Sequence, residues 1–219
     1  MGFFWLTFVY PFYAFRLWRR DLQIAMQHPT LLAIALYYRF YYFFFYPVFR
    51  QAYQKFKAGV SVHELVYGET PLHTFEDILT HIKLHHSDHF VDLGCGRGML
   101  TFYVNLAYGI PCTGVDIIPT FITKANQMVK KHRLEDVDFV QAQIMDFPLE
   151  MASVVYITAT CFSPETLKKL KNKLFSELRS GSTVISITHP IVDEGFSHIW
   201  DGTLPFYWGH CEVYVFRKL

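Results

Sequence analysis

The sequence predicts an α/β fold built on a Rossmann-like, mostly parallel β-sheet. An apolar strand at residues 90–93 runs into three closely spaced glycines and then into an apolar helix. A second short apolar strand at residues 111–117 ends in Asp116. Beyond it, strand and helix patterns alternate as far as residue 188. This alternation is typical of βαβ units with right-handed crossovers, which bring the carboxyl ends of the parallel strands to one edge.

The turn after the first strand has the composition of a ligand-binding loop. Glycine adopts the positive φ angles of a sharp turn and lets backbone N–H groups approach a ligand. The N-terminus of the helix behind the turn carries a partial positive charge. The stretch reads Asp92-Leu93-Gly94-Cys95-Gly96-Arg97-Gly98. Taken alone, this spacing fits several kinds of nucleotide site and also a strand–helix junction that binds nothing.

The remaining elements follow from hydrophobic spacing. Helical periodicity predicts amphipathic helices over 71–84 and 120–132. Ser163 and Pro164 have the composition of a helix start, and Gly181 marks the end of that helix. Further strands are expected within 137–147, 153–162 and 183–188. A terminal hairpin is expected over 206–216, with its turn at Gly209-His210.

The glycine turn, the acid before it and the acid that ends the second strand resemble the class I S-adenosylmethionine-dependent methyltransferases. The resemblance covers residues 67–216 and implies a seven-stranded sheet, parallel except for a terminal antiparallel hairpin. It also implies S-adenosylmethionine as cofactor. A carboxylate near the turn would meet the cationic methionine end, and Asp116 would take the ribose hydroxyls.

The same resemblance implies a set of cofactor contacts. The exit loop of the third strand would hold the adenine through Gln143 and Ile144, with Asp146 as the alternative acid. An amide at position 143 can make the hydrogen bond that an acid makes in other members. The full cofactor set is Tyr67, Glu69, Thr70, Asp92, Gly94, Cys95, Gly96, Gly98, Met99, Asp116, Ile117, Gln143, Ile144 and Thr158.

A narrower likeness is to the non-SET lysine methyltransferases of the disruptor of telomeric silencing type. It is carried by Tyr67-Gly68-Glu69-Thr70, the glycine turn and the closing strand from Trp208 to Phe216. In that family such a loop closes over the cofactor, and the acceptor is a protein lysine. Here residues 158–162 replace the asparagine-rich segment of that family. The candidate acceptor residues, which would align a neutral amine for in-line attack, are Thr158, Thr160, Phe162 and Trp208.

Two other functions stay open from the sequence. One is a methyltransferase for a lipid or small lipophilic molecule at a membrane. The other is a non-catalytic Rossmann-like module tethered through its N-terminus. The intact glycines and both acids favour an enzyme, because decay of the cofactor site would first remove them.

Residues 1–60 form an aromatic-rich, basic extension, and residues 61–219 hold the methyltransferase-like domain. Two apolar runs, 2–15 and 30–49, flank the basic segment from Arg16 to Arg20. The second run is long enough to span a bilayer, but Arg39 within it costs about 2.5–3.5 kcal/mol on insertion scales. The extension is therefore either a membrane anchor, with residues 1–50 at the bilayer and a cytoplasmic catalytic domain, or a helical cap in a cytoplasmic protein.

Neither the net charge nor the histidines and cysteines indicate a nucleic-acid-binding protein or a metalloprotein. The formal net charge is +1 and the chain has no strongly basic tail, so nucleic-acid binding is not indicated. His81, His85, His86 and His89 lie close together, but no cysteine or suitably spaced carboxylate joins them. A solvated helix end accounts for them better than a metal site does. The four cysteines show no paired spacing and are expected to be reduced.

Overall fold

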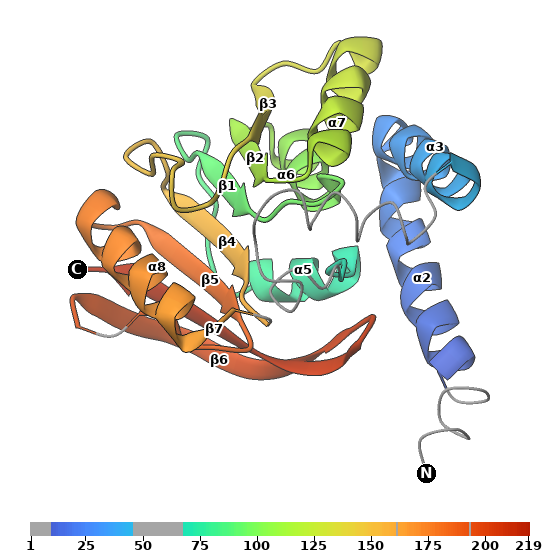
Figure 1. Cartoon of the computed structure of the whole chain (residues 1–219). Coiled ribbons are helices and arrows are strands. Elements are labelled where there is room, and N and C mark those ends of the chain that lie inside the picture. Colours follow the sequence, from blue (N-terminus) through green and yellow to red (C-terminus); the bar gives the residue numbers. More distant parts are fainter. Residues whose placement is uncertain (1–9, 46–67, 161, 193) are drawn as a thin grey trace.

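The chain folds around a seven-stranded β-sheet in the computed structural model (Figure 1), which describes residues 10–45, 68–160, 162–192 and 194–219. The strand order is β3-β2-β1-β4-β5-β7-β6. The first five strands are parallel, and β7 runs antiparallel to β5 and to β6. Their bounds are β1 Phe90–Leu93, β2 Cys112–Asp116, β3 Val137–Gln141, β4 Val154–Thr158, β5 Thr183–Ile187, β6 Phe196–Phe206 and β7 Gly209–Lys218. The predicted fold class is confirmed.

Helices cover both faces of the sheet, because alternate strand residues point to opposite sides. On β4, Val154 and Tyr156 join the core under one set of helices, while Val155 and Ile157 join the core under α8. The first set comprises α5 (Leu72–Leu79), α6 (Met99–Tyr108) and α7 (Pro119–His132), and α8 spans Pro164–Glu177. Figure 1 shows α8 separated from α6 and α7 by the sheet.

Two N-terminal helices, α2 (Tyr10–Gln27) and α3 (Pro29–Phe45), pack against α5 and α6. They contribute Ile24, Leu31 and Ile34 to the same core that holds the apolar face of α5. The basic segment from Arg16 to Arg20 lies inside α2 and does not separate two helices. Among the described residues, neither helix has the length and apolarity that a bilayer-spanning segment requires.

Three elements differ from the sequence prediction. Helix α5 is shorter, since His81 and Ile82 bond to carbonyls three residues back and tighten the last turn. Strand β6 is much longer than expected and carries Pro205 at the edge of the sheet, where a missing N–H is tolerated. The hairpin turn lies at residues 207–208, before Gly209. Both turn side chains contact the rest of the protein, Tyr207 at Asp21 and Trp208 at Gly68.

Candidate functional site

A small cavity of about 40 Å³ lies where β1 and β4 end and α6 begins. Eight of the residues that the sequence assigns to the cofactor line it. They are Glu69, Thr70, Asp92, Gly94, Cys95, Gly96, Met99 and Thr158. Gly68, Leu100 and Tyr156 complete the lining. The open edge of a parallel sheet is where such folds bind ligands, so the position of the cavity agrees with the predicted cofactor site.

The glycine turn leaves room for a ligand on one side and is closely packed on the other. Gly94 has φ 89°, and a Cβ placed on it would meet nothing within 4 Å. Gly98 has φ 79°, and a Cβ there would lie 2.2 Å from the ring of Phe139. Only glycine satisfies both the backbone and the packing at position 98. The turn therefore fits a ligand that lies against its backbone at Gly94.

Asp92 is a buried carboxyl group with one side-chain hydrogen bond, from Thr101, to offset its loss of hydration. Its side chain is 3% exposed, and the Thr101 hydroxyl donates a hydrogen bond to Oδ2 at 3.3 Å. Burial raises the pKa of Asp92 to about 7, the Thr101 hydrogen bond opposes this, and the nearby Asp116 adds to it. A cationic group in the adjoining cavity would stabilise the ionised form. Asp92 thus fits the cationic methionine end of S-adenosylmethionine.

Asp116 holds the turn in place. Its Oδ2 accepts a hydrogen bond from the Gly96 N–H at 2.9 Å, and its Oδ1 accepts one from the Ile118 N–H at 2.8 Å. Each carboxylate oxygen can accept a second bond. The ribose contact assigned to Asp116 stays a prediction, and the structure adds a role in fixing the glycine turn.

The predicted adenine residues lie outside the small cavity. Gln143 is exposed in the loop after β3, and Ile144 is half-buried against the core under α8. Ile117 is half-buried next to Ile118. The Ala142 N–H bonds to the Asp116 carbonyl at 3.2 Å and keeps this loop beside the end of β2. The adenine contacts stay predictions, and Tyr67 lies outside the described residues.

The four candidate acceptor residues are only partly brought together. Thr158 lines the cavity, and the Trp208 ring covers Gly68, where a Cβ would lie 2.4 Å from it. The Thr160 hydroxyl is 3.1 Å from that of Thr188, and Phe162 packs against the core under α8. Neither Thr160 nor Phe162 lines the cavity, so their assignment to the acceptor stays a prediction.

Three residues near the site were not singled out by the sequence. Arg97, between two glycines of the turn, forms a two-point ion pair with Glu69. The Tyr156 hydroxyl lies 2.6 Å from that of Thr70 and ties β4 to the loop before α5. Thr188 has φ 76°, an unusual conformation for a β-branched residue. In the sequence, Arg97 could have been noticed as a basic residue between two glycines of the turn.

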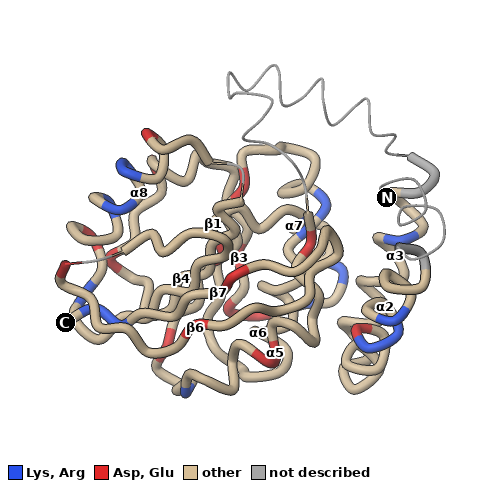
Figure 2. The backbone as a smooth tube through the Cα atoms, turned by 90° about the horizontal axis from the view of Figure 1, so that it is seen from below, with Lys and Arg blue, Asp and Glu red and all other residues tan. Residues whose placement is uncertain are grey.

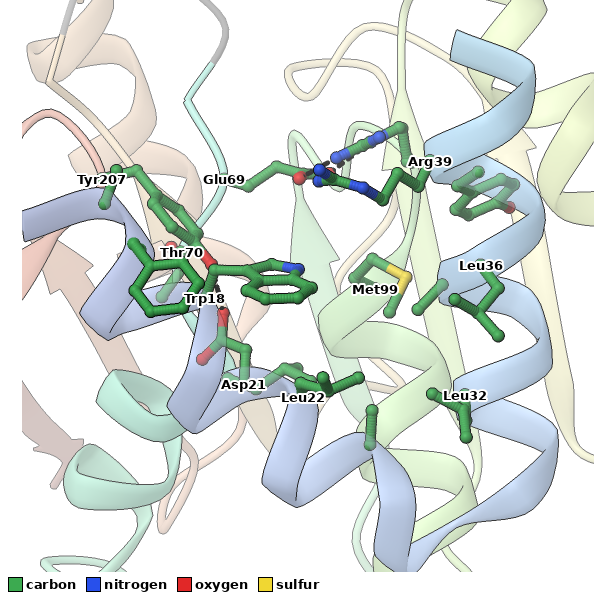
Figure 3. Close-up of a pocket in the computed structure, with 17 residues that line it drawn as sticks. Trp18, Asp21, Leu22, Leu32, Leu36, Arg39, Glu69, Thr70, Met99 and Tyr207 are labelled. Carbon is green, nitrogen blue, oxygen red and sulfur yellow. Dashed lines mark hydrogen bonds and ion pairs between the residues drawn. The ribbon is translucent and has the colours of Figure 1, made fainter. Parts of the chain in front are cut away.

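A second and larger cavity, of about 610 Å³, adjoins the first through Glu69, Thr70 and Met99. Figure 3 shows Trp18 and Leu22 of α2 facing Leu32 and Leu36 of α3 across it. Its walls are mostly apolar. Charged side chains, Asp21, Arg39, Glu69 and Arg97, also line it.

The histidines expected at the end of α5 are dispersed in the structure. His81 stacks on the Trp200 ring with the centroids 3.9 Å apart, and His89 Nε2 lies 2.8 Å from the Thr113 hydroxyl. Within the described parts of the chain, no group of three or more histidine, cysteine, aspartate or glutamate side chains could hold a metal ion. Cys95, Cys112 and Cys211 carry free thiols.

Comparison with known sequences gives the same class as the site. The family model of the ANTKMT methyltransferase domain matches residues 92–195. Phosphoethanolamine N-methyltransferase of Plasmodium falciparum is 26% identical over 134 residues, covering 58% of this chain and 50% of that protein. A carboxy-S-adenosyl-L-methionine synthase of Yersinia pestis is 31% identical over 100 residues, covering 43% of this chain and 38% of that protein. The chain thus spans half or less of the length of these relatives.

Solved structures share the fold over the sheet and its helices. An RNA methyltransferase from Salinibacter ruber in complex with S-adenosyl-L-homocysteine is 25% identical, with a TM-score of 0.56 over 68% of this chain and 93% of that one. TrmN from Thermus thermophilus is 15% identical, with a TM-score of 0.57 over 66% of this chain and 48% of that one. With a cavity bounded by the glycine turn and Asp92, the chain contains a domain of the class I S-adenosylmethionine-dependent methyltransferase type.

Proposed function

We propose that this methyltransferase transfers methyl groups to a lysine side chain of a protein. The match to the ANTKMT domain carries the proposal, because that name refers to an adenine nucleotide translocase lysine methyltransferase. The loop Gly68-Glu69-Thr70, which belongs to the likeness to non-SET lysine methyltransferases, lines the small cavity, and Trp208 lies against Gly68 of this loop. The acceptor in this proposal is a primary amine on a protein.

Methyl transfer depends more on alignment of the acceptor with the methyl group than on general acid–base catalysis. The bound cofactor supplies an electrophilic methyl group on a sulfonium. The chain must hold a neutral amine in line with it and keep water away. In this proposal Thr158, which lines the small cavity, and Trp208, which lies against Gly68, border the amine. Thr160, whose hydroxyl lies 3.1 Å from that of Thr188, contributes from the turn after β4.

The test is methylation with cofactor that carries an isotopically labelled methyl group. Purified full-length protein is incubated with membrane and soluble protein fractions, and methylated lysines are located by mass spectrometry. The Gly94→Val variant is the matched control, because its side chain would enter the cavity and strain a backbone with φ 89°. Label on lysine that depends on Gly94 supports the proposal. Label only on lipid or small molecules contradicts it.

A small amine is the second candidate acceptor. The relative with 26% identity is named for methylation of phosphoethanolamine, which is also a primary amine. The same labelled reaction with free phosphoethanolamine and with phosphatidylethanolamine vesicles separates this candidate from protein lysine. Turnover of either amine without protein labelling would favour the small-amine or lipid function.

We also propose that the solvent-exposed side chains of α2 and α3 associate with a membrane surface. Large apolar side chains of these helices are exposed, with Phe12 73% and Phe40 60% exposed. Phe15 and Leu36 are 57% and 56% exposed and also line the larger cavity between the helices. Exposed arginines accompany them at positions 16, 19, 20 and 39. Figure 2 shows that Lys and Arg positions dominate the charge on these helices. Aromatic and cationic side chains together favour the interface of an anionic bilayer.

Vesicle sedimentation tests this membrane proposal. The full chain should bind anionic phospholipid vesicles, and Phe12→Ser with Phe15→Ser should weaken binding. Met151→Ser is the control, because Met151 is 52% exposed but lies outside the two helices. Equal vesicle binding by all three proteins would contradict the proposal.

A further inference from the structure

The basic residue of the glycine turn connects the cofactor site to the N-terminal helices. Arg97 pairs with Glu69 through Nε and Nη2, and the two side chains are only 20% and 26% exposed. Glu69 lies in the loop before α5 and lines both cavities. The pair therefore places a negative group, Glu69, at both cavities and a positive group, Arg97, at the larger one.

Two tyrosines of α3 cover the guanidinium of Arg97. Its Cζ lies 6.0 Å from the ring centroid of Tyr38 and 5.0 Å from that of Tyr42. Tyr42 in turn meets Phe121 of α7 edge-on at 5.9 Å. Aromatic faces attract a guanidinium and restrict its orientation. Helix α3 thus fixes the position of Arg97, although α3 lies outside the residues 92–195 that the family model matches.

The Tyr38 hydroxyl is a buried polar group at the larger cavity. Tyr38 is 1% exposed and lines the larger cavity with Arg97 and Glu69. Among the described residues, nothing forms a hydrogen bond to this hydroxyl. A buried polar group without a partner destabilises the folded state, so such groups normally meet a ligand or another residue.

These groups match one chemical class. A guanidinium and a phenolic hydroxyl suit a carboxylate, and the neighbouring Glu69 suits an ammonium group. The N-terminus of α6 begins at Met99, whose side chain lines both cavities, and it adds a partial positive charge. An α-amino acid carries both required charges, on an ammonium and a carboxylate group bonded to the same carbon atom. The methionine portion of S-adenosylmethionine is such a group.

We propose that Tyr38 of α3 and the Arg97–Glu69 pair bind the amino-acid end of the cofactor, so that the N-terminal helices complete the cofactor site. Tyr38 and Arg97 contact the carboxylate, and Glu69 contacts the ammonium. The proposal rests on the cofactor class and not on the identity of the methyl acceptor. The larger cavity then serves, at its Arg97 end, as the continuation of the cofactor site.

Binding calorimetry on the full chain tests this with two ligands. S-adenosylhomocysteine has the amino-acid end, whereas 5′-methylthioadenosine lacks it. Tyr38→Phe should weaken binding of S-adenosylhomocysteine about fivefold to tenfold, the effect of one hydrogen bond, and leave 5′-methylthioadenosine binding unchanged. Arg97→Gln should weaken S-adenosylhomocysteine more strongly with the same selectivity.

Tyr37→Phe is the matched control, since Tyr37 neighbours Tyr38 on α3 but stacks on Tyr41 with centroids 5.8 Å apart. It should leave both affinities unchanged. The ligand-free Tyr38→Phe protein should melt at the same or a higher temperature, because the change removes an unpartnered buried hydroxyl. Unchanged S-adenosylhomocysteine affinity in Tyr38→Phe, or equal loss for both ligands, would overturn the proposal. Wild-type binding is measured without any acceptor, so failure of lysine methylation would not affect this result.

Discussion

At the scale of single residues, Asp92 links cofactor binding to pH. Its pKa is raised from 3.8 to about 7, mainly by burial. Between these values the folded protein holds a proton that the unfolded chain has released, so the stability of the ligand-free protein falls as pH rises through this range. A cationic ligand favours the ionised carboxylate. Binding of S-adenosylmethionine should therefore release a proton near neutral pH.

This linkage gives a measurable pH dependence. Affinity for S-adenosylmethionine should rise about tenfold from pH 6 to pH 8, because the ionised fraction of Asp92 rises by about that factor around a pKa of 7. Asp92→Asn should bind more weakly and lose this part of the pH dependence. Calorimetry at several pH values measures both, with the exposed Glu150→Gln as control. If the affinity of the wild-type protein does not change with pH, the Asp92 carboxylate does not interact with the bound cofactor.

A second residue-scale prediction concerns Asp116. Asp116→Ala should weaken S-adenosylmethionine binding by about 1.5–3 kcal/mol, the range for hydrogen bonds to a charged group. The loss has two sources, because the carboxylate is predicted to accept the ribose hydroxyls and also anchors the Gly96 N–H. Titration with the cofactor measures the change, and thermal melting checks that the variant folds. Wild-type affinity in a folded variant would place the ribose elsewhere.

The sequence was informative about the residues of the turn and less so about their partners. Asp92, Gly94 and Gly96 line the cavity because the turn is encoded by adjacent residues with fixed spacing. Tyr38 and Arg97 meet only through packing of α3, about sixty residues away in the chain, and no local pattern reports such a contact. Burial of Asp92, which sets its pKa, is likewise a tertiary property.

At the scale of elements, one polar network joins α2 to the domain. Asp21 Oδ1 accepts hydrogen bonds from the backbone N–H of His73 at 3.1 Å and lies 2.7 Å from His73 Nδ1. Asp21 Oδ2 accepts one from the Tyr207 hydroxyl at 2.7 Å. His73 lies in the first turn of α5 and Tyr207 in the hairpin turn, so a single carboxylate of α2 connects three elements. This contact holds the side chain of the turn residue Tyr207 against α2.

Removing this carboxylate should destabilise the fold. Asp21→Ala leaves the buried His73 and the half-buried Tyr207 without their acceptor, and we expect the free energy of unfolding to fall by about 2–5 kcal/mol. Glu150→Ala, an exposed acid, should change it little. Urea denaturation monitored by circular dichroism compares the two variants. Equal stability would show that α2 is only loosely docked.

Element prediction succeeded where the pattern was local. The cap at Ser163, whose hydroxyl accepts from the Thr166 N–H at 3.2 Å, and the buried Leu170 and Leu174 place α8 as the spacing predicted. Strand β6 was missed because it is an edge strand whose side chains are mostly half-buried or exposed, so its alternation is weak. The strand is defined by its hydrogen-bonded pairing with β7 and not by a hydrophobic pattern of its own.

At the scale of the whole molecule, α2 and α3 present two different faces. Their inner faces bury Leu31, Ile34 and Tyr38 in the main core, and their outer faces expose large apolar and basic side chains. The sequence offered a membrane anchor or a helical cap as alternatives. Packing on α5 and α6 supports the cap, and the outer face leaves membrane association as a compatible proposal. The division at residue 60 stays a prediction.

Removal of the N-terminal helices should therefore impair the whole protein. Complete burial of one large apolar side chain stabilises folding by about 1.5–3 kcal/mol, so Ile24, Leu31, Ile34 and Tyr38 together supply about as much as the usual net stability of a domain. A chain of residues 61–219 should melt at a lower temperature and bind a hydrophobic dye through the uncovered α5 and α6. It should also bind S-adenosylhomocysteine more weakly, because it lacks Tyr38. If this chain melts like the full-length protein and binds with equal affinity, α2 and α3 form a separate unit that serves neither the core nor the cofactor site.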